Sequence, residues 1–458
     1  MGESGSELAE LVATRLERAP RPISPGGLAA VRADMVFDAG SAGAATLVIW
    51  DGRIRVHPGR TRTPTTRISG DRATIVSIIG GEISGLDAFL DGHIHVEGDV
   101  GLSLHLDGLL GTAQGRMVAT GVIESAGVRT ALVEAGARRA PIAVLLHGLG
   151  ATSASMLPVL RDLALDHRVI APDLPGHGAS SAPPVRYDAA FFATWLEALL
   201  DAKGVDKAVI VGNSLGGRIG LELGLRRPAR TSALVLLAPA VAFRRLRQAV
   251  PLVRLLRPEL AGLPLPTVAL PEWAVAGAIR LLFAHPGRLP PGVCRAAAGE
   301  WARVYRSRPH RVAFASALKE IYLDDAFGDE GFWRRLPSLL PPALFVWGAR
   351  DVLVPAAFAR HVVAAVPSAH SVVLPDCGHV PQFEQPARTA FLTRAFLADA
   401  GPAESAESAE SAGPAGSAEP VGPVGPAGPV GPVGPVGPAG PAEPAKSAAG
   451  PILALFGQ

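Results

Sequence analysis

The chain has few cysteines, almost no net charge and no long apolar run, which argues against several classes of protein. Only two of its 458 residues are cysteine, Cys294 and Cys377, so we expect no disulfide framework and a reducing, cytoplasmic setting. Basic and acidic residues nearly balance, at 43 and 41, and no basic block marks a nucleic-acid surface. No uninterrupted apolar run reaches the roughly 18 residues of a membrane-spanning helix. The first twenty residues also lack the apolar segment of a signal peptide.

The length of the chain predicts two or three domains, and the pattern of residues along it divides into four zones. Residues 1–115 mix helix and strand signals and predict a small α+β domain, and 116–126 read as a linker. Residues 127–400 alternate short apolar runs with helical segments, which indicates an α/β fold with a mostly parallel sheet. A stretch at about 241–334 interrupts the alternation and predicts a helical cap. Residues 401–458, rich in Pro, Gly and Ala, predict a disordered tail.

Six apolar runs are expected to form the parallel strands of this sheet. They are residues 142–146, 169–171, 208–211, 233–237, 343–347 and 371–374. Open α/β sheets place their functional sites at the carboxyl ends of their strands. Residues that follow these runs are therefore the first candidates for a site.

The strongest candidate is Ser214, in the sequence Gly212-Asn-Ser-Leu-Gly216. This Gly-x-Ser-x-Gly element follows an apolar run and precedes a helix-compatible segment, which is the context its chemistry requires. The serine then sits on a sharp turn that projects its hydroxyl from the sheet, and small neighbours let the backbones approach closely. Ser214 is predicted to be a nucleophile.

A serine hydroxyl needs a histidine to accept its proton and a carboxylate to orient that histidine. Asp351 and His379 each follow a predicted strand, and they come in the order acid then histidine that this fold uses after the serine. The sequence also leaves three other acids that compete for the role of Asp351, namely Asp324, Asp325 and Asp376.

The reaction of such a serine also needs two backbone N–H donors for the oxyanion. One is expected from Leu215, the residue after the nucleophile. The other is expected from Leu149, in the glycine-rich turn His147-Gly-Leu-Gly150 that follows residues 142–146. Only the backbones of these two leucines act.

Other reactive side chains are interpreted as structural. His147 and His177 are expected to shape turns, and Cys377 to pack beside the catalytic histidine without acting as a nucleophile. His93 and His95 alternate along a predicted strand, but no third ligand has the spacing of a metal site. We expect neither a metal nor a cofactor.

Taken in order, these motifs identify a resemblance. Residues 127–400 resemble the α/β-hydrolase superfamily through His147-Gly-Leu-Gly150, Asp173-Leu-Pro-Gly-His-Gly-Ala-Ser180, Gly212-Asn-Ser-Leu-Gly-Gly217, Trp347-Gly-Ala-Arg-Asp351 and Gly378-His379. The Gly-Asn-Ser-x-Gly-Gly run is also similar to that of the carbon–carbon bond hydrolases of aromatic degradation. Dehalogenases and epoxide hydrolases of this fold use an aspartate as nucleophile, so Ser214 argues against both.

The N-terminal zone resembles the sterol carrier protein type 2 family over about residues 8–112. The matching features are the runs 47–50 and 54–57 around the turn Asp51-Gly52, and the later run Asp91-Gly-His-Ile-His-Val-Glu-Gly-Asp99. The resemblance implies a sheet and helices that enclose an apolar tunnel for lipids or acyl chains.

The expected activity is hydrolysis of a carboxylic ester with an apolar or lipid-like part, through an acyl-enzyme. Three alternatives stay open: a carbon–carbon bond hydrolase, a cofactor-free perhydrolase or haloperoxidase, and a protein that mainly binds lipid. No nucleic-acid partner is expected. The basic, apolar stretch 243–257 is interpreted as part of the cap, with weak membrane-surface contact as the alternative. The sequence leaves the oligomeric state open.

Overall fold

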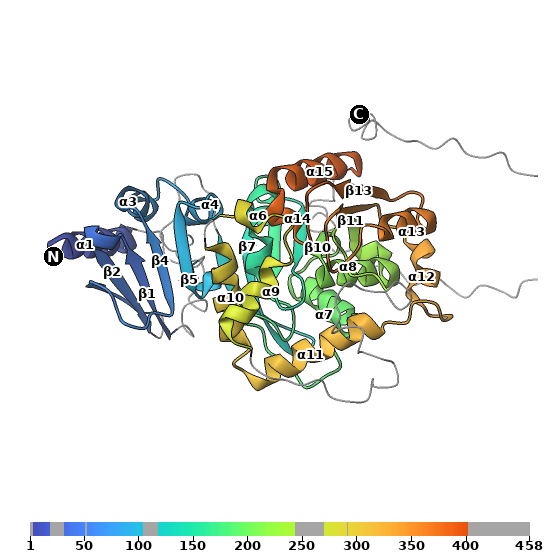
Figure 1. Cartoon of the computed structure of the whole chain (residues 1–458), viewed down its shortest axis with the longest axis horizontal. Coiled ribbons are helices and arrows are strands. Elements are labelled where there is room, and N and C mark those ends of the chain that lie inside the picture. Colours follow the sequence, from blue (N-terminus) through green and yellow to red (C-terminus); the bar gives the residue numbers. More distant parts are fainter. Residues whose placement is uncertain are drawn as a thin grey trace, which may run out of the picture. The chain divides into compact units, whose positions relative to one another are not determined.

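The computed structural model describes residues 3–18, 32–50, 53–103, 118–242, 270–290 and 292–401 (Figure 1). The chain divides into two units, Met1–Ser411 and Ala412–Gln458, and the described residues all belong to the first. The predicted tail, apart from Gly401, lies outside the described residues. The basic stretch 243–257 and the Asp51-Gly52 turn also lie outside them.

The N-terminal part of this unit contains a five-stranded sheet in the order β3-β2-β1-β4-β5. Its strands are β1 (Arg32–Asp38), β2 (Ala44–Trp50), β3 (Arg53–Pro58), β4 (Thr66–Gly70) and β5 (Ile94–Gly98). Only β1 and β4 pair in parallel, while the other neighbours are antiparallel. Strands β2, β3 and β5 lie where the sequence predicts strands, whereas β1 and β4 were not predicted.

The register of this sheet places its apolar residues on one face. Phe37 lies opposite both Ala45 and Ile68, and Ile68 lies opposite Val96. All of them are buried, together with Leu8. Because side chains alternate along a strand, the residues between them face the other way. One face of the sheet is therefore apolar and is covered by helices.

These covering helices are short. They are α1 (Glu3–Arg18), α3 (Arg72–Gly80) and α4 (Gly85–Leu90). Asp71 caps α3 by accepting a hydrogen bond from the backbone N–H of Thr74, and Ser84 caps α4 through the N–H of Asp87. Polar caps at both N-termini explain why these two helices begin where they do.

The larger sheet has eight strands in the order β13-β12-β11-β10-β8-β9-β7-β6. Its strands are β6 (Ala119–Ser125), β7 (Val128–Ala135), β8 (Ile142–Leu146), β9 (Arg168–Pro172), β10 (Ala208–Asn213), β11 (Thr231–Leu237), β12 (Ala343–Gly348) and β13 (His370–Leu374). From β9 to β13 all neighbours pair in parallel, and only β6 and β7 are antiparallel to their neighbours. The six predicted strands are all present, each within two residues of its predicted ends. The predicted α/β-hydrolase fold with a mostly parallel sheet is confirmed.

The prediction of a linker at residues 116–126 was wrong, because most of it forms the edge strand β6. This strand is half exposed, with Val122 60% exposed, so it lacks the continuous apolar run of the central strands. It turns into β7 through Ala126 and Gly127, which both have positive φ, at 49° and 72°. An alanine with positive φ is uncommon in a tight hairpin turn, so the sequence Ala126-Gly127 does not predict this turn.

Alternating residues of the central strands feed two separate cores. In β10, Val209 and Val211 pack into one core, and Ala208 and Ile210 pack into the other. Helices α6 (Leu157–Leu163) and α15 (Pro386–Asp399) cover the first face. Helices α7 (Ala189–Ala202), α8 (Leu215–Arg226) and α13 (Phe358–Ala365) cover the second. Burial on both faces explains why the central strands carry nearly continuous apolar runs.

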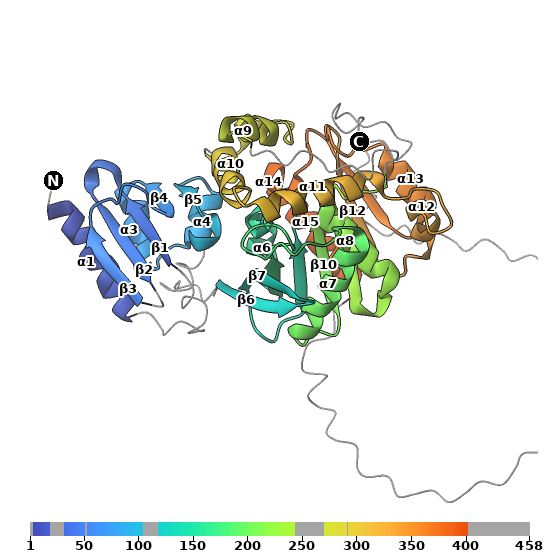
Figure 2. The ribbon, with the colours of Figure 1, turned by 90° about the horizontal axis from the view of Figure 1, so that it is seen from below.

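The described part of the segment between β11 and β12 is mostly helical, as the sequence predicts. Its described helices are α9 (Glu272–Arg280), α10 (Val293–Val304), α11 (Arg308–Leu323) and α12 (Phe332–Arg335). Figure 2 shows α9, α10 and α11 gathered on one side of the strands, beside α14 (Pro381–Glu384). Short 3₁₀ helices complete the described structure: η1 (Gly40–Ala42), η2 (Ser153–Met156), η3 (Pro228–Arg230), η6 (Pro286–Arg288) and η7 (Leu336–Ser338). No helix among the described residues has the length and apolar character needed to cross a bilayer.

A buried ionic network fixes α8, the helix behind the candidate nucleophile. Glu222 accepts hydrogen bonds from Arg218, Arg226 and Arg335 at 2.8–2.9 Å, and its side chain is only 3% exposed. Arg218 also donates to Asp324 at 2.7 Å. Burial alone would raise the pKa of Glu222, but the hydrogen bonds from Arg335 and the charge of Arg218 outweigh it and lower the pKa to about 2.

Replacing Glu222 by glutamine should therefore lower the free energy of unfolding by about 3 kcal/mol, because it leaves buried guanidinium groups without their anion. The folded-state pKa lies below the ordinary value of 4.5, so this stabilisation is complete above about pH 4.5 and is lost as the pH falls toward 2. Urea unfolding at pH 7 and at pH 3 measures both effects. The matched control is Glu197→Gln, which breaks the more exposed pair with Arg227 and should cost less than about 1 kcal/mol. An equal loss in both variants, or a loss that does not shrink at pH 3, would contradict this assignment.

Candidate active site

Ser214 lies on a strained turn between β10 and α8, with φ 53° and ψ −113°. A Cβ on Gly212 would lie 2.4 Å from the backbone of Gly216, and one on Gly216 would lie 2.1 Å from the carbonyl oxygen of Leu146. Only glycine fits at either position, which is the physical reason for the Gly-x-Ser-x-Gly spacing. The residues around Ser214 are buried, while Ser214 itself is partly exposed. The turn therefore presents the hydroxyl at the end of the strand.

Asp351 and His379 meet directly. The Nδ1 atom of His379 lies 2.7 Å from Oδ2 of Asp351, and both side chains are almost fully buried. The other carboxylate oxygen of Asp351 accepts hydrogen bonds from the backbone N–H groups of Leu353 and Val354, at 2.7 and 2.9 Å. Both oxygens are thus satisfied, and the carboxylate is fixed in the orientation that aligns the imidazole.

The three competing acids have other partners. Asp324 binds the Arg218 guanidinium at 2.7 Å, and Asp376 binds Arg350 at 2.7 Å. The side chain of Asp325 lies beside the backbone N–H of Phe327, at 3.4 Å. The geometry therefore favours Asp351 over each of the alternatives.

The turn at residues 147–150 lies against the nucleophile. A Cβ on Gly148 would come within 3.3 Å of the Cβ of Ser214. Leu215 begins α8, so its backbone N–H belongs to the unpaired first turn of that helix. The predicted donors Leu149 and Leu215 are thus carried by two segments that converge on Ser214.

His147 and His177 are fully buried in the turns around this site. The two ring nitrogens of His147 are both occupied, Nδ1 by the carbonyl oxygen of Gly148 at 2.8 Å and Nε2 by the backbone N–H of Leu174 at 2.9 Å. Burial lowers the pKa of His147 to about 4 and that of His177 to about 3. Two neutral, buried imidazoles of this kind hold backbone turns, and His147 has no nitrogen free to accept a proton from Ser214.

Cys377 is buried beside the histidine loop, and burial raises the pKa of its thiol to about 12. A thiol that stays protonated near neutral pH is a poor nucleophile. This geometry favours the packing role expected from the sequence.

Two polar residues that the sequence did not single out hold the site together. Asn213 donates from its side-chain amide to the carbonyl oxygens of Leu237 and His379, at 3.0 and 3.1 Å, and so ties the nucleophile turn to the histidine loop. Glu384 accepts from the backbone N–H groups of Gly378 and His285, at 2.6 and 2.9 Å. Asn213 lies inside the recognised motif, but no sequence pattern marks Glu384, because its partners are distant or backbone groups.

The cap reaches both sides of the site. The backbone N–H of His379 donates to the carbonyl oxygen of Leu282 at 2.6 Å. On the opposite side, Trp301 of α10 and Phe314 of α11 lie against Gly150. The cap therefore contacts both the histidine loop and the turn at residues 147–150.

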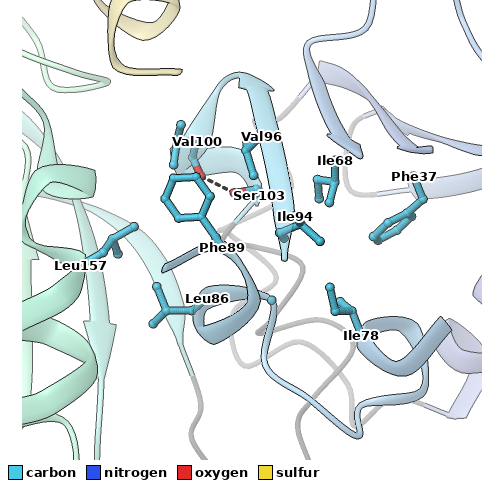
Figure 3. Close-up of a pocket in the computed structure, with 11 residues that line it drawn as sticks. Phe37, Ile68, Ile78, Leu86, Phe89, Ile94, Val96, Val100, Ser103 and Leu157 are labelled. Atoms are coloured by element: carbon cyan, nitrogen blue, oxygen red, sulfur yellow. Dashed lines mark hydrogen bonds between the residues drawn. The ribbon is translucent and has the colours of Figure 1, made fainter. Parts of the chain in front are cut away.

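An apolar cavity lies between the N-terminal sheet, helices α3 and α4, and Leu157 at the start of α6, as shown in Figure 3. Aliphatic and aromatic side chains and Gly85 make up nearly all of its lining: Phe37, Ile68, Ile78, Gly85, Leu86, Phe89, Ile94, Val96, Val100, Ser103 and Leu157. The one polar side chain among them, Ser103, donates its hydroxyl to the carbonyl oxygen of Val100 at 2.6 Å. The lining of this small cavity is therefore almost entirely apolar.

His93 and His95 are exposed on the polar side of the sheet at β5. Among the residues that the structure describes, no three histidine, cysteine or acidic side chains are grouped to hold a metal ion.

Comparison with known proteins agrees with this geometry. Residues 141–386 match the family described as alpha/beta hydrolase fold, and residues 15–111 match the SCP-2 sterol transfer family. Among curated relatives, the 2-hydroxymuconate semialdehyde hydrolase of Pseudomonas sp. strain CF600 is 30% identical over 286 residues, which cover 61% of this chain and 94% of that protein.

Two solved structures at 25% sequence identity show the same similarity. One is the 2-hydroxy-6-oxo-6-phenylhexa-2,4-dienoate hydrolase of Rhodococcus sp. strain RHA1, with a TM-score of 0.52 over 61% of this chain and 99% of that one. The other is a membrane phospholipase A described as a bacterial virulence factor, with a TM-score of 0.53 over 62% and 86%. The chain belongs to the alpha/beta hydrolase family and carries an SCP-2 sterol transfer domain ahead of its hydrolase fold.

Proposed function

We propose that the chain is a serine hydrolase that cleaves a carboxylic ester with an apolar acyl or alcohol part. The observation that carries this proposal is the 2.7 Å contact between His379 and Asp351, next to a serine on a strained turn. Asn213, the neighbour of that serine, is hydrogen-bonded to His379. A nucleophile, a base and an orienting acid are the groups that acyl transfer requires.

In the proposed reaction, Ser214 attacks the ester carbonyl while His379 accepts its proton. Asp351 holds the imidazole and stabilises its charged form. The backbone N–H groups of Leu149 and Leu215 bind the oxyanion. His379 then protonates the leaving alcohol, and water, activated by the same histidine, hydrolyses the acyl-enzyme.

The apolar cavity of the N-terminal domain supports an apolar substrate. A domain of the SCP-2 sterol transfer family, lined by hydrocarbon side chains, would bind the substrate or product and raise its concentration near Ser214. The phospholipase A among the similar structures is named for action on a lipid ester, which favours the same class.

A carbon–carbon bond hydrolase is the second candidate, because two of the similar proteins are named as hydrolases of dienoate or semialdehyde compounds. The same serine, histidine and aspartate would serve it. A perhydrolase is a further alternative, and no feature of the described residues favours it. A protein that mainly binds lipid is another, and the apolar cavity and the match to the SCP-2 sterol transfer family are compatible with it.

Hydrolysis of p-nitrophenyl esters from acetate to palmitate tests the proposal against the second candidate. Each buried methylene contributes about 0.8 kcal/mol, so kcat/KM should rise about fourfold per methylene until the pocket is full. A synthetic vinylogous 1,5-diketone measured beside the esters should be cleaved at least about 100-fold more slowly. Faster cleavage of the diketone would instead establish the carbon–carbon hydrolase. Absence of turnover on every ester and on the diketone would favour the lipid-binding role.

A further inference from the structure

Glu300 is a buried carboxyl group that the proposed reaction does not use. It lies on cap helix α10 and is 7% exposed. Its Oε2 atom accepts a hydrogen bond from the hydroxyl of Thr152 at 2.9 Å, and Thr152 is equally buried. Thr152 comes three residues after Leu149, on the segment that carries a proposed oxyanion donor. The contact therefore joins the cap to the oxyanion turn.

Residues near the contact between Glu300 and Thr152 also pack against the turn that carries Leu149. Trp301, the residue after Glu300, and Phe314 stand so close to Gly150 that a Cβ there would lie 3.3 and 3.0 Å from their rings. On the other side, the backbone N–H of Ser153 donates to Asp173 at 2.8 Å. The segment from residue 148 to 153 is thus held by Ser214 at one end and by Asp173 and the cap at the other.

The charges that face Glu300 come from three elements. Asp99 follows β5, Asp173 follows β9, and Arg303 lies one turn along α10, 3.8 Å from Oε1 of Glu300 and 3.3 Å from Asp99. Burial, followed by the charges of Asp99 and Asp173, raises the pKa of Glu300 to about 8. Arg303 and the hydrogen bond from Thr152 lower the pKa by less. Tyr305 also faces this group, and burial keeps it protonated by raising its pKa. Glu300 is therefore uncharged at neutral pH.

We propose that Glu300 is a positioning residue for the oxyanion turn: its neutral carboxyl group docks α10 against Thr152, and loss of its proton undocks the cap from the turn. An ionised Glu300 would be a buried charge beside two aspartates, and it would need water to enter the contact. The turn that carries Leu149 would then lose its support from the cap. This inference rests on the proposed serine hydrolase function, and it adds a reversible loss of activity in mild alkali.

The test is the pH dependence of kcat and KM for p-nitrophenyl butyrate, measured in the full chain and in Glu300→Gln. With the group titrating near pH 8, kcat of the parent should fall about tenfold between pH 7 and pH 9, with KM changed less than about twofold. Glutamine keeps the acceptor for Thr152 and cannot ionise. The variant should match the parent within about twofold at pH 7 and lose no activity up to pH 9. An alkaline fall that persists in Glu300→Gln overturns the proposal.

Two further variants separate positioning from general stability. Thr152→Val removes the donor and should lower kcat about tenfold at pH 7 while KM stays within about twofold. Glu272 is an exposed residue at the start of α9, and Glu272→Gln should leave the pH dependence of kcat and KM unchanged. A Thr152→Val effect confined to KM, or an equal loss in Glu272→Gln, also overturns the proposal.

A substrate-independent readout keeps this inference distinct from the proposed function. Fluorophosphonates label an activated serine although they are not carboxylic esters. Their reaction needs the nucleophile, the base and the oxyanion turn. Labelling of Ser214 that falls between pH 7 and pH 9 in the parent and not in Glu300→Gln supports the positioning role, even if no ester is hydrolysed. A parent chain that neither hydrolyses esters nor reacts with the probe overturns both proposals.

Discussion

Replacing Ser214 by alanine should lower kcat for p-nitrophenyl butyrate by about a million-fold. Without the hydroxyl, no acyl-enzyme forms, and the remaining catalysis comes only from binding and from the oxyanion donors. The helix and sheet around the turn are held by backbone contacts, such as that of the Ser214 N–H with Leu237 at 3.0 Å, and these survive the substitution. The melting temperature should therefore stay close to that of the parent. Steady-state kinetics and thermal unfolding on the same preparations provide both values.

The control for this variant is Ser338→Ala, an exposed serine in the 3₁₀ helix Leu336–Ser338, which should retain full activity. If the Ser214→Ala variant kept more than about 1% of the parental kcat, Ser214 would not be the nucleophile. A loss accompanied by a large fall in melting temperature would mean that the turn, and not the hydroxyl, had been removed.

Replacing Asp351 by asparagine should lower kcat by about ten-thousand-fold. Asparagine can still accept the hydrogen bonds from Leu353 and Val354, so the loop keeps its shape. Its amide N–H would then face Nδ1 of His379 in place of the carboxylate oxygen. The imidazole would be held in the tautomer that carries its proton on Nε2, and it could not accept a proton from Ser214. The loss should appear in kcat, with KM little changed, because substrate binding does not involve this pair.

Asp376→Asn and Asp324→Asn are the matched controls, since the sequence left these acids as alternatives. Asp376 pairs with Arg350 on the exposed side of the histidine loop, and its loss should change kcat less than about threefold. Asp324→Asn should act on stability through Arg218 and leave kcat similar. A larger kcat loss in either control than in Asp351→Asn would reassign the orienting acid.

The parts of the fold that the sequence predicts well are those with a local signal. The six predicted strands each contain a short apolar run, and in the central ones such as Ile142–Leu146 every residue of the run is buried. The position of Ser214 follows from the glycines on either side of it, which the close backbone approach requires. Asp351 and His379 follow from the chain order and from their place after strands.

The parts that were missed depend on contacts between distant residues. Strand β6 has one exposed side and a turn at Ala126 and Gly127 that no common turn sequence announces. Glu300 and Thr152 are 148 residues apart, and neither lies in a motif. Asp351 is favoured over Asp324 by partners that lie far away in the sequence, His379 for Asp351 and Arg218 for Asp324. Long-range side-chain pairing is not visible in one sequence, since many pairings are compatible with the same pattern.

The alternating burial of β10 restricts how a protein of this kind can diversify. Adding or removing one residue within Ala208–Asn213 would exchange the two sets of side chains between opposite cores, so such changes are strongly selected against. The connection between Leu237 and Ala343 is not a strand of the sheet, so a change in its length does not exchange the two cores. Changes in its helices would alter which molecules are accepted, and those that keep the contacts of Leu282 with His379 and of Glu300 with Thr152 would leave the chemistry at Ser214 unchanged. Lineages of this architecture should therefore diverge in substrate mainly through the cap.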